Sequence, residues 1–451
     1  PIPIMDHALK MDDEMTYFPR NTFDQCVDFI VSDCQYGIDG ALPMIYTNAS
    51  GTVAESLYGR ATKAAAYALK ARVLLYAASP LFNGNADYAK FANEDGTLLF
   101  APKDDSKWGK AAAAAKEAID KIEGSSYYGL YYSDEPDNGY RNYMELFLPS
   151  KKWNKEYIFA RNQGTGYSDN IHQEKCMAAN GMGGWSGLCP TQELVDAYEM
   201  ANGSTPIIGY NADGTPIING ASGYSETGFA ATAGKHYPAG VYNMYVGREP
   251  RFYASINFNG QQWRGRQLEF WQGGKDGINV SKVDYCCTGY LLRKTADEGV
   301  DVINGKGGMK EASILFRVGS LYLDYAEALN EAEGPVDDVY KYVDAIRKRA
   351  GLPGLAKGLD KDKMRERIQH ERQIELAFEA GHRYFDCHRW KIAEKTDNGY
   401  MHGMNITATN KVDYSKRSTV GDSRVFEKKH YLFPIPQSEM DLSLIHISEP
   451  T

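Results

Sequence analysis

The stretch MRERIQHERQIELAFEAGHRYFDCHRW, residues 364–390, decides the fold, because a charge-dense helical segment runs directly into an aromatic and basic cluster. If the segment is one helix, side chains three and four residues apart share a face. Ile368 and Phe378 then bracket Glu371 and Glu375 on a single stripe. The spacing therefore predicts two carboxylates beside an apolar seam.

Carboxylates beside such a seam need cationic partners, since charged side chains are almost never fully buried unless they are paired. We expect a structural ion-pair network among Glu371, Glu375, Arg372, Arg383 and Arg317, with Arg389 as a further candidate. Acid/base catalysis is the alternative interpretation, because perturbed carboxylates also occur at active sites. Two glutamates four residues apart are neighbours on one helix face, which favours salt bridges over a pair that straddles a substrate.

The composition describes a large globular chain. Its 451 residues are 43% hydrophobic and 12% aromatic, which is enough for a sizeable core in one domain or two joined ones. The net charge of -9 and the pI near 5.6 argue against nucleic acid as a partner. No apolar run approaches the ~20 residues of a membrane-spanning helix.

Motifs for metal or cofactor chemistry are absent from the sequence. The seven cysteines have no CxxC spacing, and the nine histidines form no HExxH. No GxSxG, P-loop or dinucleotide fingerprint occurs. We therefore predict no metal site, no cofactor and no catalytic residue.

Small and apolar residues repeat at helical spacing in two separate regions. Residues 60–79 carry alanines and a leucine at intervals of four and three before Pro80, and the pattern recurs from Trp108 to Gly124. A second pair spans 321–332 and 339–350, with a break between. Such closely packed pairs resemble the ~34-residue unit of a tetratricopeptide repeat. The predicted fold is mainly α-helical.

Between these helices, residues 126–310 are rich in glycine, tyrosine and asparagine, with turn signals and only short strand-like runs. Long irregular segments on a rigid scaffold commonly carry binding sites, so we expect ligand in this lobe. Aromatic rings offer flat apolar faces that suit sugar rings. The candidate ligand contacts are Trp185, Tyr167, Trp263 and Trp271. Trp185 is favoured because glycines surround it, although a loop tryptophan is more often a packing anchor.

Six motifs along the chain are similar to those of the SusD/RagB family of outer-membrane nutrient-binding lipoproteins of Bacteroidetes. They are YGRATKAAAYALKARVLLYAASPLFNG (58–84), PTQELVDAYEM (190–200), TGYLLRK (288–294), ILFRVGSLYLDYAEALNEA (314–332), ERQIELAFEAGHRYFDCHRW (371–390) and YLFPIPQSEM (431–440). The resemblance implies a mainly α fold with tetratricopeptide-like helix pairs, a long loop-rich lobe and short β elements.

The same resemblance implies a function. Proteins of that family bind glycans, or in some members peptides, as a lid over a TonB-dependent transporter of the SusC type, and they are not enzymes. It also implies a surface location on the outer membrane through a lipid anchor. Because the family's signal segment, lipid-bearing cysteine and first helices are absent, we expect the chain to be a fragment with its N-terminus missing.

We expect one SusD-like domain over residues 1–442, with a helical scaffold at 21–125 and 311–395 and the ligand-facing lobe at 126–310. Residues 443–451, SLIHISEPT, resemble translated adapter sequence and are expected to be a non-native tail.

Two other functions stay open from the residues alone. One is a glycoside hydrolase with paired carboxylates, and the other is a helical-repeat adaptor for protein partners.

Overall fold

A computed structural model describes residues 1–5, 19–148, 154–162, 167–305, 312–379, 381–434 and 436–438. Within these ranges, the side chains of residues 162, 167–171 and 312 are not described. The expected tail at 443–451 lies outside the described residues.

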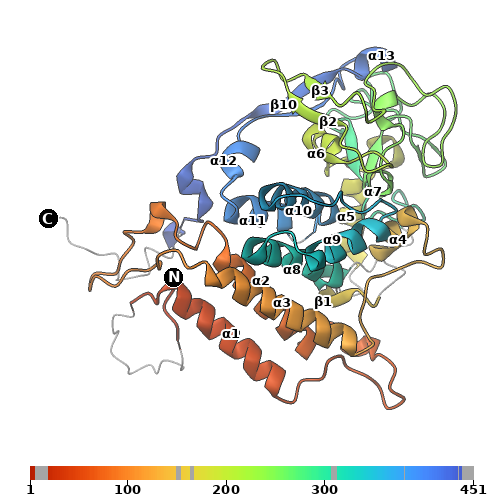
Figure 1. Cartoon of the computed structure of the whole chain (residues 1–451). Coiled ribbons are helices and arrows are strands. Elements are labelled where there is room, and N and C mark those ends of the chain that lie inside the picture. Colours follow the sequence, from red (N-terminus) through yellow and green to blue (C-terminus); the bar gives the residue numbers. More distant parts are fainter. Residues whose placement is uncertain are drawn as a thin grey trace.

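The scaffold is a stack of antiparallel helices drawn from both ends of the chain (Figure 1). Its N-terminal helices are α1 (Phe23–Asp39), α2 (Lys63–Ala78) and α3 (Ser106–Gly124). Its C-terminal helices are α8 (Val318–Glu333), α9 (Asp337–Arg349), α10 (Lys361–Glu375) and α11 (His382–Arg389). Helix α2 packs on α1 and α3, α3 packs on α8, and α8 contacts α9 and α10. The predicted mainly helical fold is confirmed.

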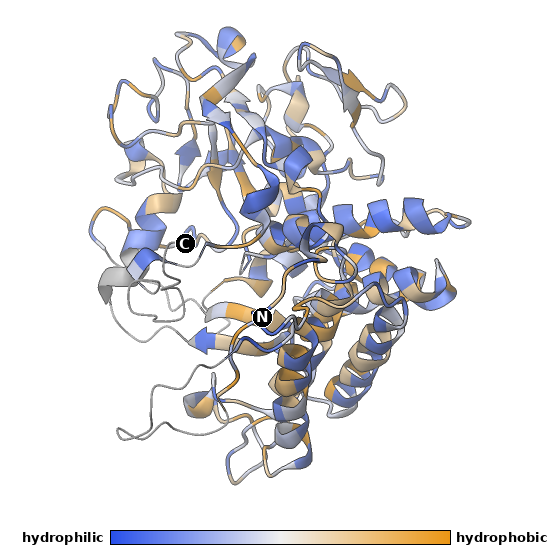
Figure 2. Ribbon diagram, turned by 90° about the vertical axis from the view of Figure 1, so that its left-hand side faces the viewer, coloured by the Kyte–Doolittle hydropathy of each residue, from blue (hydrophilic) through white to orange (hydrophobic). Residues whose placement is uncertain are grey.

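Helix α2 shows why the paired helices approach closely. It begins after Thr62, whose side chain accepts a hydrogen bond from the amide of Ala65 at 3.2 Å. Ala64, Ala68 and Ala71 are buried at the contact with the neighbouring helices. Small side chains bring the backbones together, and α2 is buried on more than one side because it packs on both α1 and α3. Figure 2 shows hydrophobic and hydrophilic residues interspersed along the helices.

The 364–390 stretch is two helices rather than one, so the single-helix expectation is wrong. Helix α10 ends at Glu375, and α11 begins at His382. Between them Phe378 has φ +62°, a left-handed conformation that no continuous helix contains. Carbonyl groups at the break accept hydrogen bonds from elsewhere: Lys294 donates to Ala377 O at 2.8 Å. These tertiary bonds compete with further helical turns.

The remaining elements, in the lobe and in the segments that follow it, are short helices and two-stranded antiparallel sheets, with strand pairs β1–β8, β2–β3, β4–β7, β5–β6 and β9–β10 among the described residues. The strands are β1 (Tyr157–Asn162), β2 (Ile207–Tyr210), β3 (Pro216–Ile218), β4 (Ile256–Phe258), β5 (Gln262–Trp263), β6 (Arg266–Gln267), β7 (Tyr290–Leu292), β8 (Ala312–Arg317), β9 (Gly399–Met404) and β10 (Arg417–Arg424). The helices are α4 (Gly139–Leu146), α5 (Tyr167–Met177), α6 (Gln192–Ala197), α7 (Pro250–Ser255), α12 (Ala393–Thr396) and α13 (Lys411–Tyr414).

An aromatic core of its own holds the lobe together, separate from the core of the scaffold helices. Tyr245 stacks against Phe258 with ring centroids 4.4 Å apart, and Phe252 lies 5.4 Å from Phe258. These rings are buried, so the lobe has a rigid centre although its surface consists of loops. The scaffold core and this aromatic core are the two largest of the five buried hydrophobic clusters among the described residues, and the aromatic one also includes Ile374 of α10 and Met404 of β9. The division into scaffold and lobe at the predicted bounds stays a prediction.

A buried ion-pair network joins the lobe to the scaffold. Arg251 of α7 contacts Glu371 at 2.5 Å and Glu375 at 3.0 Å, and both glutamates belong to α10. Arg349, the last residue of α9, pairs with Glu375 and lies 3.0 Å from Glu156. All five side chains are almost fully buried. The carboxylates are therefore held by cations on several elements at once.

The other arginines of the predicted network are distributed differently. Arg317 contacts Glu375 at 3.0 Å, so it belongs to the same network. Arg372 instead pairs with Asp386 at 2.9 Å in a neighbouring cluster. Arg383 corrects the prediction: it is partly exposed, and among the described residues it has no ion-pair partner. Arg383 is the second residue of α11, after the break, and not part of the helix that carries Glu371 and Glu375.

Candidate functional site

Trp185 lies on a glycine-rich loop that folds back over the end of α5. The amide of Trp185 donates to Lys175 O at 2.6 Å, and the amide of Ser186 donates to Ala178 O at 3.0 Å. A Cβ at Gly184 would lie 2.1 Å from Ala178 O, so only glycine fits at this position. The backbone of α5 therefore fixes the loop.

Helix α5, on which this loop folds, is itself held in place by buried contacts. Glu174 of α5 is fully buried, accepts a hydrogen bond from Arg264 at 2.8 Å and a second from the amide of Asp297 at 3.2 Å. Burial raises the pKa of the Glu174 carboxyl, although both hydrogen bonds act in the opposite direction. These contacts connect α5 to the loops around β5 and β7, so the Trp185 platform rests on the lobe.

The Trp185 ring is the exposed aromatic surface of this loop. Its side chain is 37% exposed. The ring of His172 stacks on it at 5.2 Å, and the Lys175 ammonium lies 5.2 Å from the ring centroid. Leu188 and Ile303 are also exposed, and Ile303 lies against Gly183. The result is an apolar surface with polar groups at its edge.

Trp271 comes from a second glycine-rich loop that adjoins the first. The Asn180 side chain donates to Gly277 O at 3.2 Å, and a Cβ at Gly181 would lie 2.0 Å from Lys275 O, so the two loops are in close contact. Trp271 is half-buried, and its indole nitrogen is buried without a hydrogen-bond partner. An orphaned donor of this kind is costly unless something satisfies it.

Of the two other candidates, Trp263 differs from expectation and Tyr167 stays a prediction. Trp263 is 2% exposed in the aromatic core, with the Arg293 guanidinium 4.7 Å from its ring. It offers no face to a ligand, because β5 turns the ring inward, and its place is that of a packing anchor. Tyr167 begins α5, but its side chain lies outside the described residues.

A cavity on the scaffold was not anticipated from the sequence. It has a volume of about 410 Å³ and lies among α3, α8, α10 and Trp390. Its polar groups are largely engaged already: the Trp390 indole donates to Glu327 at 2.7 Å, and Glu331 pairs with Arg365 at 2.6 Å. Groups satisfied within the protein have little to offer a ligand.

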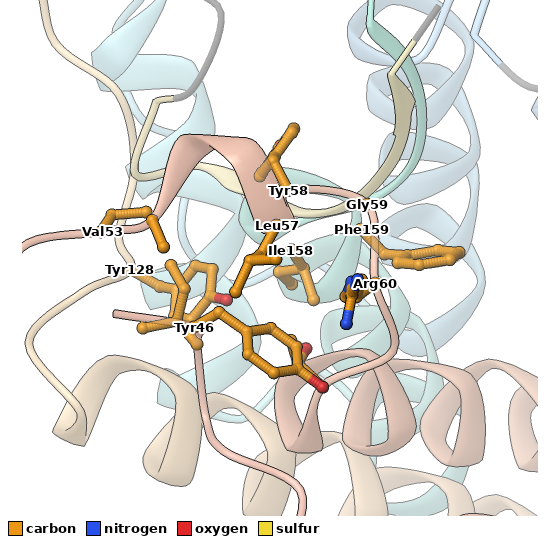
Figure 3. A pocket seen from close by; sticks show the side chains of 12 residues that line it. Tyr46, Val53, Leu57, Tyr58, Gly59, Arg60, Tyr128, Ile158 and Phe159 are labelled. Carbon is orange, nitrogen blue, oxygen red and sulfur yellow. The ribbon is translucent and has the colours of Figure 1, made fainter. Parts of the chain in front are cut away.

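A smaller cavity lies where the loop before α2 meets β1 (Figure 3). Tyr46, Tyr128 and Arg60 are among the side chains around it. Its volume of about 20 Å³ is room for roughly one water molecule, which excludes a sugar ring.

The described residues show neither a metal-binding cluster nor a membrane-spanning helix. No group of three or more histidine, cysteine or acidic side chains within the described ranges could hold a metal ion. Across the same residues, no helix combines the length and the apolar character needed to span a membrane.

Comparisons with known proteins identify the family and the fold. The model of the SusD family matches residues 149–444. SusD-like protein P2 of Formosa agariphila is 34% identical over 147 residues, which are 30% of this chain and 25% of that protein. SusD-like protein P25 of the same organism is 42% identical over 82 residues, 18% of this chain and 15% of that protein. The matches thus span a quarter or less of these curated relatives.

Solved structures match over almost the whole chain. The structure of BT4246 has a TM-score of 0.79 and 27% identity, covering 98% of this chain and 78% of that one. A SusD-like protein from Bacteroides fragilis, BF3747, has a TM-score of 0.69 at 27% identity over 98% of this chain and 74% of that one. A second protein of that organism, BF0978, described as a SusD-like carbohydrate-binding protein, shares the fold at 21% identity, with a TM-score of 0.67 over 98% of this chain and 74% of that one.

Proposed function

The chain belongs to the SusD family, and on that premise we propose that it is a cell-surface protein that captures an oligosaccharide and passes it to a TonB-dependent transporter. The observation that carries the proposal is the Trp185 ring, 37% exposed on a loop that glycines and α5 fix in place. A rigid, partly exposed indole beside polar groups suits the CH-lined face of a sugar ring, because binding costs little ordering entropy.

The proposed mechanism is binding and release without bond chemistry. Hydrolysis of a glycosidic bond needs two carboxyl groups that reach the substrate. Glu371 and Glu375, the pair that the sequence offers, are 1% and 0% exposed and already bound to arginines. These two groups cannot contact a substrate, which supports a capture role over the hydrolase alternative.

Family membership supports the remaining parts of the proposal. We place the protein on the outer membrane as a surface lipoprotein, with a transporter of the SusC type as its partner. A peptide ligand in place of a glycan, and a helical-repeat adaptor for proteins, are the other outcomes that the experiment must distinguish.

A glycan array on the purified chain, with release of reducing ends assayed in parallel, tests the proposal. We expect binding without cleavage. Trp185→Ala should reduce that binding at least tenfold, since stacking on a tryptophan carries much of the contact area. Tyr36→Ala is the matched control, because Tyr36 is 84% exposed on α1 of the scaffold. Cleavage, or binding that both variants retain, would refute the proposal.

A further inference from the structure

A pocket of about 260 Å³ lies between the lobe and the break that separates α10 from α11. The first turn of α6, the segment after α10, α11, α12 and β10 contribute to it. Its lining includes Glu193, Gln373, Phe378, Arg383, Asp397 and Arg424. The volume is slightly below the ~300–1,000 Å³ typical of small-molecule sites, which is the scale of one sugar ring rather than a chain.

Three polar side chains of this pocket are not engaged within the protein, whereas Arg424 donates to Gly399 O at 3.5 Å and to Thr396 O at 3.4 Å. Among the described residues, Arg383, Gln373 and Asp397 have no side-chain hydrogen bond or ion pair. Glu193 pairs with His402 at 2.6 Å through one carboxylate oxygen, while its other oxygen is buried without a partner. The contrast with the buried arginines of the same segment is sharp, because Arg372 and Arg389 are each held by carboxylates. Arg383, Gln373 and Asp397 are partly exposed, so they are free to bind a ligand that enters the cavity, and the buried Glu193 oxygen lacks a partner that such a ligand would supply.

The backbone gives a second, independent observation. Phe378 has φ +62° and its ring is 46% exposed. A left-handed conformation costs a bulky residue of the order of 1–2 kcal/mol, and a half-exposed ring recovers only part of that by burial. Strain that packing offsets only in part is typical of a functional position. Here it presents an aromatic face at the pocket.

The charges of the lining identify the class of ligand. Arg383 and Arg424 offset Glu193 and Asp397, so the pocket selects neither an anion nor a cation. It offers donors and acceptors together, and sugar hydroxyl groups both donate and accept. With two cations and two carboxylates in the lining, an acidic sugar gains no net charge attraction over a neutral one.

From these observations we infer that the pocket binds a single neutral sugar ring, with Phe378 on its apolar face and Arg383 and Asp397 on its hydroxyl groups. This site is separate from the Trp185 loop. It extends the proposed function with a second point of contact, but its occupancy does not depend on that loop.

Titration calorimetry with the methyl glycosides of glucose, galactose, mannose and N-acetylglucosamine, and with galacturonic acid, tests the inference on the whole chain. We expect saturable binding of at least one neutral glycoside. Arg383→Met should weaken it at least tenfold, because a hydrogen bond from a charged donor is lost. Arg365→Met, which removes an arginine at the scaffold cavity, is the matched control and should not change it.

Phe378→Gly separates binding from folding. Glycine relieves the left-handed backbone, so this variant should bind the sugar more weakly while its melting temperature stays the same or rises. Trp185→Ala should retain monosaccharide binding even where it loses oligosaccharide, so the two sites fail independently. The inference is overturned if no neutral glycoside binds, if Arg383→Met binds like the parent chain, if Trp185→Ala abolishes monosaccharide binding, or if galacturonic acid binds more tightly.

Discussion

Replacing Glu375 tests whether the buried ion-pair network stabilises the junction between lobe and scaffold. Glu375 is 0% exposed and lies within 3.0 Å of Arg251 and Arg317, with Arg349 as a third partner. Burial alone would raise the pKa of its carboxyl, but Arg349, Arg317 and Arg251 together lower it. The folded protein therefore holds this group as a carboxylate.

Glu375→Gln keeps the shape of the side chain and removes its charge, which leaves three buried arginines short of a partner. Breaking a buried pair by removing one member costs about 3–5 kcal/mol. Unfolding entropy of about 2.1 cal/mol/K per residue amounts to roughly 0.9 kcal/mol/K for a chain of this length. The melting temperature should therefore fall by about 3–5 °C.

Differential scanning calorimetry and urea unfolding at neutral pH measure this change. Glu366→Gln is the matched control, because Glu366 lies on the exposed face of the same helix; its melting temperature should equal that of the parent chain. A Glu375→Gln protein as stable as the parent chain would refute the argument that the network stabilises the fold.

Three further predictions follow from burial and packing. Burial, Arg72 and Arg372 lower the pKa of His382 to about 3. The stability that the neutral imidazole contributes is therefore complete above the pKa of the unfolded chain, ~6.5, and is lost as the pH falls below that value. His382→Asn should recover about 2 kcal/mol of the stability that the parent chain loses between neutral pH and about pH 5. Trp263→Ala should destabilise the lobe by about 3–5 kcal/mol in urea unfolding. Gly184→Ala should weaken oligosaccharide binding in calorimetry, since its Cβ displaces the Trp185 loop.

The scaffold could be predicted because its signal is local. Alanines at intervals of three and four placed α2 and α3 to within a few residues, and Gly334 and Pro335 located the break after α8. The end of α10 could not be predicted in the same way. Lys294 is distant in sequence, and its hydrogen bond to Ala377 O competes with local helix propensity.

The site was less accessible from the sequence for a similar reason. Glycines around Trp185 indicated a constrained loop, and that indication depends only on neighbouring residues. Trp263 is also flanked by glycines, Gly260 and Gly265. It is nevertheless buried, because β5 pairs with β6 and turns the ring into the core. The pocket at Arg383 depends on segments far apart in the chain, which no single motif describes.

The arrangement of charge explains how the proposed binding surfaces can be loops in this protein. Arg251 of the lobe contacts Glu371 of α10 at 2.5 Å, and Arg347 of α9 contacts Glu199 of the lobe at 2.9 Å. All four side chains are almost fully buried. Buried pairs of this kind add geometric constraint even where their net contribution to stability is small. The junction therefore fixes the lobe, and the loops that carry Trp185 and Phe378 can keep exposed rings and strained backbone without loss of the fold.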